Sequence, residues 1–525
     1  MGFRSRSESA RQGRARENTA RRVGKPEHGG GKRSTQSRNN STAEGHSPRS
    51  KGYQQRRPDK RQAKARQRGS GDRARDVAFA VLREVTLNDA FANLVLPGLL
   101  KDSGLAGRDA AFATELAYGC LRATGLLDAI IAKAAGRPVD KIDSVALDAL
   151  RLGTYQILRT RVDDHAAVNT SVELVKANGA AQASGFVNGV LRTITRSTPE
   201  QWLQRVAPSD SIADRALRTA HPAWIAEAFN DSLNQSSGSS NIHPELEACL
   251  VADDSRPIVH LAARPGQMSA EELALITGGE QGRLSPYAVY LEEGAPGELE
   301  PVKEGMASVQ DEGSQLIALA TVKAPLQRKD AGRWLDLCSG PGGKTAFIAS
   351  WAMGDEAQVD AVELAPHRAQ LVEKATRNLP VSIYTGDGRD LASIDGLSVP
   401  GEGYDRVLVD APCSGLGALR RRPEARWRKE ATDVAPLVAL QRELLRSALS
   451  ATALGGVTIY STCSPHRAET VDIVRSVAAE TGAEVIDLSE VFPTLEGNDA
   501  APFVQLWPHR HGTDAMFIAA LRPSH

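Results

Sequence analysis

From residue 305 onward, short apolar runs rich in β-branched residues alternate with segments of helical periodicity. Parallel strands need long crossover connections, which are usually helices, so this alternation predicts a mostly parallel, doubly wound α/β sheet. No other feature restricts the fold of the chain as strongly. Helices are expected at 344–351, 366–377 and 434–453. Strands are expected at 334–338, 359–363, 381–385, 407–410 and 457–461, with a last strand, expected to be antiparallel, at 516–521.

Residues 1–70 form a basic arm. They carry 20 Lys and Arg against 5 Asp and Glu, a net charge of +15, whereas residues 71–525 carry 44 and 59, a net charge of −15. The arm has no periodic apolar face, and such a segment cannot bury enough apolar surface to offset its ordering entropy. We predict that the arm is disordered and binds a polyanion, with a merely solubilising tail as the alternative.

Residues 71–200 have the pattern of an all-α domain. Apolar side chains recur at helical spacing, beginning with Ala78, Val81, Leu82 and Val85, and strand signals are nearly absent. The phrases ALRLGTYQ, starting at Ala149, and FVNGVLR, starting at Phe186, resemble the NusB antitermination-factor fold, a helical module that binds RNA and protein. A purely structural helical domain is the alternative. Further helices are expected at 112–121, 126–134, 145–158, 167–177 and 186–194.

Residues 201–304 are expected to form a small α+β connecting subdomain in front of the α/β domain at 305–525. Pro222 is placed in the first turn of a helix, where its missing N–H costs nothing. The Ser, Gly and Asn residues of 234–241 indicate a flexible loop. Strands are expected at 258–265 and around 289–290.

Length and composition exclude several classes of protein. A chain of 525 residues is too long for one ordinary domain. No apolar run approaches the roughly 18–20 residues that span a bilayer, and the N-terminus lacks the apolar core of a secretory signal. We therefore expect a cytoplasmic protein without membrane contact, and a monomer. The cysteines form no CxxC pair and no regular framework, so neither disulfides nor a metal site is expected; they stand at 120, 249, 338, 413 and 463.

The first predicted strand leads into a glycine loop, which reads DLCSGPGGKT from Asp336 to Thr345. A strand–loop–helix unit of this kind lets the backbone approach a ligand and directs a helix N-terminus at it. The spacing matches neither GxxxxGK[ST] nor GxGxxG. The candidate cofactor-binding residues in this loop are Cys338, Ser339, Gly340, Pro341, Gly342, Gly343 and Lys344.

Acidic residues stand at or just after the ends of three successive predicted strands: Asp336, Glu363 and Asp387. Glu363 is placed to bind the two hydroxyls of a ribose, and Asp387 to accept a hydrogen bond from an adenine amino group. Phosphates would be repelled by three carboxylates, so a nucleoside without phosphates is favoured. S-adenosylmethionine fits that description, and NAD fits less well. Each acid alone could equally be a helix cap or a solvated strand end.

Two further strand ends each present a cysteine. Asp410 ends one strand, and Cys413 follows it in the loop APCSG, while Cys463 follows another strand in STCSP. Thiolates are strong nucleophiles, and a neighbouring cation such as Lys344 or an arginine would activate either thiol. A single buried cysteine is usually inert packing. Two of them on facing loops, beside a pocket for a methyl donor, call for a chemical explanation.

Methyl transfer to C5 of cytosine supplies one. C5 attacks a sulfonium methyl only after a thiolate has added to C6 and turned the ring into an enamine. An acid at N3 or at the exocyclic amine stabilises the charge that develops. The C5 proton must then leave before the thiol is eliminated. Such a site needs a nucleophile, an acid and a second group for release.

The segments DAPCSG, CSGPGGKT and STCS resemble the RNA cytosine-5 methyltransferases of the NOL/NOP/Sun family. With a NusB-like domain in front, the chain is most similar to the bacterial RsmB (Fmu, Sun) type, which modifies small-subunit ribosomal RNA. The resemblance covers about residues 305–525, and the helical domain extends it to about residue 73. It implies a class I methyltransferase domain of Rossmann-like fold, with S-adenosylmethionine as methyl donor and a single-stranded or flipped cytosine of ribosomal RNA as substrate.

The same resemblance implies a role for each site residue. Cys463 would be the nucleophile, Cys413 would assist product release, and Asp410 would contact the base or the cofactor. S-adenosylmethionine would be bound by residues 338–344, Glu363, Asp387 and Asp410.

Two alternatives stay open at this point. One is a DNA cytosine-C5 methyltransferase with Cys413 as nucleophile, but the Glu-Asn-Val motif of that class does not follow Cys413. The other is a non-catalytic, RNA-binding ribosome-assembly factor that keeps an inactive methyltransferase fold. The presence of Asp410, Cys413 and Cys463 argues against it.

Overall fold

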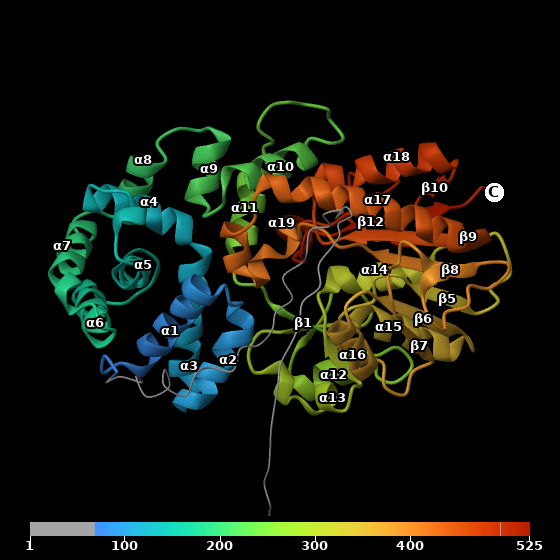
Figure 1. The fold of residues 1–525 in the computed structure, drawn as a ribbon, viewed down its shortest axis with the longest axis horizontal. Helices are drawn as coiled ribbons and strands as arrows, with labels where there is room; N and C mark the ends of the chain where they lie inside the picture. Colours follow the sequence, from blue (N-terminus) through green and yellow to red (C-terminus); the bar gives the residue numbers. More distant parts are fainter. Residues whose placement is uncertain (1–68, 494, 525) are drawn as a thin grey trace, which may run out of the picture. The chain divides into compact units, whose positions relative to one another are not determined.

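The structure is a computed structural model that describes residues 69–493 and 495–524 (Figure 1). The predicted disordered arm at 1–70 lies, except for residues 69 and 70, outside the described residues. No described helix is both long and apolar enough to cross a membrane.

The first seven α-helices form the predicted all-α domain. Aspartates at 72, 143 and 163 cap α1, α5 and α6, because each carboxylate accepts backbone N–H groups from the first helical turn. Gly104 and Gly136 end α2 and α4 in the left-handed conformation. One hydrophobic core joins all seven helices. Their bounds are α1 Arg73–Asn88, α2 Ala92–Ser103, α3 Gly107–Arg122, α4 Thr124–Ala135, α5 Ser144–Arg159, α6 Asp164–Ala177 and α7 Ser184–Ile194.

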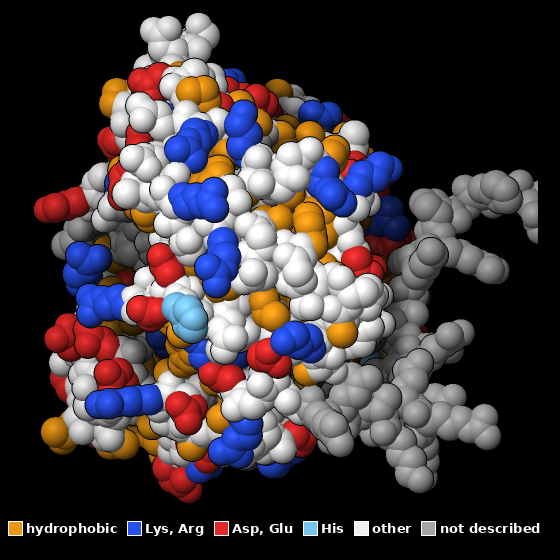
Figure 2. Space-filling model, turned by 90° about the vertical axis from the view of Figure 1, so that its left-hand side faces the viewer, with side chains coloured by type: hydrophobic (Ala, Val, Ile, Leu, Met, Phe, Trp, Pro, Cys, Tyr) orange, Lys and Arg blue, Asp and Glu red, His pale blue; other side chains and the backbone are white. Residues whose placement is uncertain are grey.

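Figure 2 shows the face of the molecule that includes this helical domain. Lys and Arg side chains are intermixed there with Asp and Glu. The described residues seen on that face therefore form no single basic patch.

The connecting region contains helices followed by a small antiparallel sheet, in the order β2-β3-β1-β4. Pro222 is the N-cap of α10 and precedes its first turn, one position before the predicted place. The boundary predicted at 304/305 stays a prediction, although β4 of this sheet follows it in the chain. The elements are α8 Pro199–Val206, α9 Ile212–Arg218, α10 Ala223–Leu233, α11 Leu246–Asp254, β1 Val259–Ala263, α12 Ala270–Thr277, β2 Glu280–Gln281, β3 Ala288–Leu291, α13 Glu300–Lys303 and β4 Ala307–Val309.

The C-terminal sheet has the predicted doubly wound topology. Its strand order is β10-β12-β9-β8-β5-β6-β7, with β11 paired to β12. The strands β9, β8, β5, β6 and β7 run parallel, and β12 is antiparallel to β9, as predicted. The strands are β5 Arg333–Asp336, β6 Gln358–Glu363, β7 Val381–Thr385, β8 Tyr404–Asp410, β9 Thr452–Thr462, β10 Glu484–Ile486, β11 Val504–Gln505 and β12 Phe517–Arg522.

Helices cover both faces of this sheet (Figure 1). Leu408 belongs to the core beneath α14 and α15, whereas its neighbours Val407 and Val409 belong to the core beneath α17 and α18. This alternation explains the continuous apolar run in β8, because a strand buried on both faces has no polar side. The helices are α14 Glu312–Lys323, α15 Gly343–Gly354, α16 Pro366–Ala375, α17 Val434–Ala451, α18 Val471–Thr481 and α19 Pro508–His511. The described residues thus form an all-α domain, a small α+β region and an α/β domain with a mixed sheet.

Candidate active site

The glycine loop joins β5 to α15 at the carboxyl edge of the sheet. The backbone N–H of Gly340 donates to Glu363 Oε2 at 3.0 Å. A Cβ atom at Gly340 would lie 2.1 Å from that oxygen, so a side chain there would require the Glu363 carboxylate to shift. Gly342 has φ of 106°, and a side chain there would collide with the backbone of Val372. The loop therefore follows a path that brings bare backbone to the surface of the site.

Glu363 ends β6 and holds the loop in place. Its carboxylate is 4% exposed and accepts N–H groups from Gly340 and Ala365. Arg368 lies against the same loop, with its guanidinium donating to Gly340 O at 2.6 Å and 3.4 Å from Glu363 Oε2. Much of the hydrogen-bonding capacity of Glu363 is thus used inside the protein.

Asp336 lies beneath the loop as a buried carboxyl group. Thr345 Oγ1 donates to its Oδ2 at 2.7 Å, and its Oδ1 has no hydrogen-bond partner. Burial raises the pKa of Asp336 to about 7, against the hydrogen bond from Thr345. This group is accordingly poised to accept a hydrogen bond from a ligand.

Asp410 ends β8 and receives two hydrogen bonds. Lys344 Nζ, from the first turn of α15, donates at 2.7 Å, and Ser461 Oγ donates at 3.1 Å. Burial alone would lower the pKa of Lys344, but the carboxylate of Asp410 outweighs it and raises that pKa above its ordinary value. Lys344 stays protonated at neutral pH and places a cation in the site.

Cys413 and Cys463 face each other across two loops, with their Sγ atoms 3.4 Å apart. The hydrogen bond between them, helped by Lys344, lowers the pKa of Cys463 against the effect of burial. The same hydrogen bond, together with burial and the carboxylates of Glu469 and Asp410, raises the pKa of Cys413 well above its ordinary value. Either sulfur can donate this hydrogen bond, and the pKa shifts favour a thiolate at Cys463 and a protonated thiol at Cys413.

A buried glutamate that the sequence analysis did not place in the site connects the two cysteine loops. Glu469 is fully buried and accepts hydrogen bonds from the N–H and hydroxyl of Ser414 and from the hydroxyl of Ser464. Gln441, from α17, donates to both Glu469 and the carbonyl of Pro412. In the sequence, the one hint of this role is that Glu469 follows Cys463 by six residues.

One cavity of about 440 Å³ is lined by five of the predicted site residues, but not by Ser339, Pro341, Gly342, Gly343 or Asp387. These five residues are Cys338, Gly340, Asp410, Cys413 and Cys463. Two further predicted residues lie behind the lining: Lys344 donates a hydrogen bond to Asp410, and Glu363 accepts one from Gly340. The remaining lining residues come from the helical domain, from α16 and from both sides of Cys413: Phe91, Arg368, Ala411, Pro412, Ser414, Gly415, Ala418, Leu419, Arg421, Arg422, Ala425 and Lys429.

Asp387 lines a different, open cavity of about 550 Å³. Its carboxylate accepts several hydrogen bonds from the guanidinium of Arg389, which lowers the pKa of Asp387. Binding to adenine would require Arg389 to move, so the predicted role of Asp387 stays a prediction.

The segment after Cys413 docks on the helical domain, which the sequence did not predict. It forms the short 3-10 helices η6 Leu416–Arg421, η7 Pro423–Trp427 and η8 Ala431–Asp433. Trp427 Nε1 donates to Arg122 O at 3.0 Å, and Arg428 donates to carbonyls at the end of α1. Arg426 is fully buried and pairs with Asp253 and Asp254. Arg421 and Arg422 of the same segment line the cavity with the cysteines.

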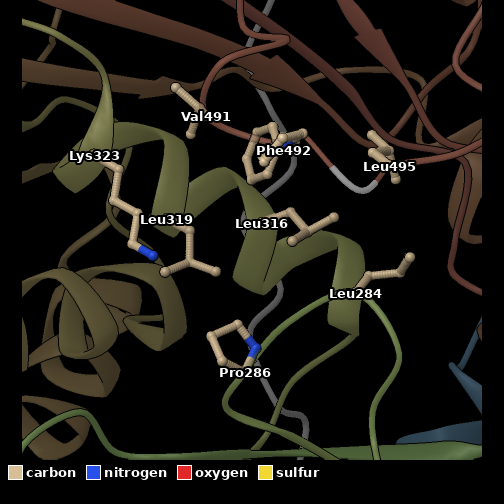
Figure 3. Close-up of a pocket in the computed structure, with 9 residues that line it drawn as sticks. Leu284, Pro286, Leu316, Leu319, Lys323, Val491, Phe492 and Leu495 are labelled. Atoms are coloured by element: carbon tan, nitrogen blue, oxygen red, sulfur yellow. The ribbon is translucent and has the colours of Figure 1, made fainter.

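A third cavity, of about 170 Å³, is apolar and lined by none of these residues. Figure 3 shows Leu316, Leu319 and Lys323 of α14 facing Val491 and Phe492, with Leu284 and Pro286 below. The described residues that line it include no cysteine and no carboxylate, and Lys323 is their single charged group.

Comparison with known proteins identifies the family of the chain. The family model described as 16S rRNA methyltransferase RsmB/F matches residues 323–522, and that of the NusB family matches residues 72–196. The chain is 56% identical over 455 residues to Rv1407, a Mycobacterium tuberculosis (strain ATCC 25618 / H37Rv) protein named as a methyltransferase, and the match covers 86% of this chain and 96% of that one.

A second relative is the ribosomal RNA small subunit methyltransferase B of Klebsiella pneumoniae, at 30% identity over 455 residues, with 85% of this chain and 97% of that one covered. The crystal structure of PH0851 has the same fold, with a TM-score of 0.69 at 20% identity over 87% of this chain and 100% of that one. Because relatives at 30% identity and above share almost their whole length with it, the chain belongs to the RsmB/F family of 16S rRNA methyltransferases and carries an N-terminal domain of the NusB family.

Proposed function

We propose that the protein transfers a methyl group from S-adenosylmethionine to C5 of a cytosine in 16S ribosomal RNA, through a covalent adduct between Cys463 and C6 of the base. The observation that carries this proposal is the pair of thiols 3.4 Å apart, lining the same cavity as Asp410 and the glycine loop. The choice of 16S ribosomal RNA, met in the cytoplasm, rests on the family and on the names of the relatives.

The residues around the glycine loop fit S-adenosylmethionine. Gly340 leaves no side chain between the loop and a ligand, and Asp336 Oδ1 is a buried acceptor without a partner. Asp336, Glu363 and Asp410 present carboxyl groups there, which suit the hydroxyls and positive charges of a sulfonium nucleoside better than phosphates. When bound, S-adenosylmethionine would supply the methyl group as a sulfonium electrophile, and its sulfur would keep the electron pair of the broken S–CH₃ bond to leave as S-adenosylhomocysteine.

The thiolate of Cys463 would act first. Its sulfur forms a bond to C6, and the electron pair of the C5–C6 double bond moves to C5, which can then bond to the methyl carbon. Lys344 stabilises the thiolate, and Asp410 accepts a hydrogen bond from the exocyclic amine of the base.

Release would then require Cys413. The C5 proton leaves to water, the C5–C6 double bond re-forms and the C6–S bond breaks, which returns the electron pair to Cys463. The thiol of Cys413 donates its hydrogen bond to the departing sulfur and so stabilises the leaving thiolate. This role needs a protonated Cys413, as the raised pKa of that thiol provides.

Trapping with 16S ribosomal RNA transcribed with 5-fluorocytidine tests the proposal. Fluorine at C5 cannot leave as a proton does, so an adduct that forms persists and is seen as a slow band on a denaturing gel. We expect adducts with the wild type and with Cys413→Ala, and none with Cys463→Ala. Cys249→Ala, in a separate core, is the matched control and keeps the adduct.

On ordinary RNA, Cys413→Ala is expected to accumulate the adduct, because elimination is slowed. Adduct formation by Cys463→Ala but not by Cys413→Ala would make Cys413 the nucleophile, as in the DNA enzymes. Absence of S-adenosylmethionine binding in calorimetry would identify a non-catalytic assembly factor instead.

A further inference from the structure

Another cavity, not described above, lies next to the catalytic one and is lined by residues of the helical domain and of the later part of the chain. It measures about 270 Å³ and is lined by Tyr118 and Arg122 of α3, Arg256 before β1, and Arg420 and Arg421 of η6. Arg421 lines the catalytic cavity as well, so the two cavities meet at this residue. If the target base of an RNA chain enters the catalytic cavity, the nucleotides next to that base can reach this neighbouring cavity.

The arginines of this cavity differ in whether they are already paired. Arg420 and Arg421 are held by Asp514, at 2.7 and 2.8 Å, and Arg421 also pairs with Asp311. Arg122 and Arg256 make no side-chain hydrogen bond or ion pair with any described residue. For Arg122 this is unusual, because its side chain is largely buried, at 9% exposure for the residue, and its Nε has no partner.

A buried guanidinium without an anion is costly, so the site is built for a negatively charged ligand. Among the described residues, Glu115 is the only one that brings a carboxylate to this cavity, and its Oε1 accepts a hydrogen bond from the hydroxyl of Tyr155 at 2.6 Å. Four guanidinium groups face four carboxylates here: those of Asp311, Asp514 and Glu115, and that of Glu424, which acts on Tyr118. No described carboxylate forms an ion pair with Arg122 or Arg256, so a phosphodiester would supply the anion that these two side chains lack.

Tyr118 adds an uncharged donor. Burial, and to a lesser extent the carboxylate of Glu424, raises the pKa of Tyr118 to about 12. Its hydroxyl thus stays protonated and can donate to a phosphate oxygen. Sites that bind single-stranded RNA typically combine arginine guanidinium groups with an aromatic ring.

We propose that Arg122, Arg256 and Tyr118 form a subsite for the backbone phosphate of a nucleotide flanking the target cytosine. The subsite rests on the proposed function, because it takes the RNA that reaches the cysteines. It gives the helical domain a direct share in placing the substrate.

The full-length chain and its Arg256→Gln and Arg122→Gln/Arg256→Gln variants test the subsite. Binding of 16S ribosomal RNA transcript would be measured by filter binding over a series of NaCl concentrations. Loss of charge-assisted contacts to one phosphate should weaken binding about tenfold in the double variant and reduce the slope of log K against log [NaCl] by about 1. The KM for RNA should rise in parallel, with kcat and S-adenosylmethionine affinity unchanged.

Arg161→Gln, at an exposed arginine of the helical domain that lines neither cavity, is the matched control. If the double variant binds RNA with the affinity and salt slope of this control, the subsite is wrong. Arg256 is exposed, so Arg256→Gln should fold normally, and an unchanged salt slope in that variant would also count against the subsite. The proposed function is tested by a separate measurement, the 5-fluorocytidine adduct of the wild type. Absence of that adduct would contradict the proposed function, whatever the result with the arginine variants.

Discussion

The hydroxyl oxygens of Ser414 and Ser464 lie 3.0 Å apart, and each serine directly follows one of the two cysteines of the catalytic cavity. Both hydroxyls also donate to the same carboxylate oxygen of Glu469. The contacts that hold the two thiols at their spacing are therefore made by the serines that follow the cysteines. A buried carboxylate keeps the two loops together where a disulfide would remove the nucleophile.

Glu469→Gln should loosen this arrangement. The amide has the same size but lacks the second acceptor and the charge, so the free energy of unfolding should fall by about 2 kcal/mol. Urea unfolding measures this change, and the rate of 5-fluorocytidine adduct formation should fall with it. The matched control is Glu373→Gln, at an exposed position of α16. Unchanged adduct kinetics in Glu469→Gln would limit the role of Glu469 to stability.

Lys344→Met should alter the pH dependence of the reaction. Without the cation the pKa of Cys463 rises, so the acid limb of the kcat/KM profile should move to higher pH. At a pH below that limb, the rate should fall about tenfold for every pH unit by which the limb moves. Lys344→Arg, which keeps the charge, should retain most of the wild-type profile. An acid limb that stays in place in Lys344→Met would show that Cys463 owes its activation to Cys413 alone.

Asp336 should make the protein less stable as the pH rises. Its folded pKa of about 7 lies above the unfolded value, so its stabilising effect is complete below about pH 4 and is lost as the pH rises to 7. The full effect is on the order of 4 kcal/mol, because the folded pKa lies about three pH units above the unfolded one. Asp336→Asn should remove this part of the pH dependence in urea unfolding, and the exposed Asp395→Asn should not. Parallel curves for the wild type and Asp336→Asn would mean that the carboxyl is ionised in the folded state.

Gly125→Ala should disturb the docking of the helical domain. A Cβ atom there would lie 2.2 Å from the ring of Trp427, which is held by its hydrogen bond to Arg122. We expect a loss of about 1–3 kcal/mol in thermal unfolding. Gly189→Ala, in α7 with no atom near its Cβ, is the control and should be neutral or stabilising by up to about 1 kcal/mol. Equal effects of the two substitutions would place the strain in the helices and not at Trp427.

Removal of residues 1–70 should flatten the salt dependence of RNA binding. The arm carries a net charge of +15 and only two aromatic residues, so it can displace counterions but offers little for base recognition. Filter binding of 16S ribosomal RNA measures the slope, and bisulfite sequencing of the methylated RNA identifies the target nucleotide. A change in that nucleotide would contradict this prediction.

The strand–helix alternation was sufficient to predict the doubly wound sheet, because periodicity and strand length are local properties of the chain. The same holds for the helical domain, where aspartate and glycine caps mark several helix ends. The cavity that unites Cys338, Asp410, Cys413 and Cys463 followed from strand order, since parallel strands present their carboxyl ends at one edge.

What the sequence did not reveal depends on contacts between distant segments. Glu469 reads as an ordinary helix-flanking acid until its burial against Ser414 and Ser464 is known. Arg426 reads as one member of a solvated basic run, yet it is fully buried against Asp253. The pairing of Asp387 with Arg389 is a local contact that the expected strand-end pattern does not encode.

The loop of Cys413 continues directly into η6 and η7, and the end of η7 anchors to α3 and α4 through Trp427. A catalytic domain expressed alone would therefore expose the indole of Trp427 and leave Arg428 without its carbonyl partners. The helical domain thus supports the segment that carries one of the two cysteine loops, and we expect loss of that domain to alter the position of Cys413.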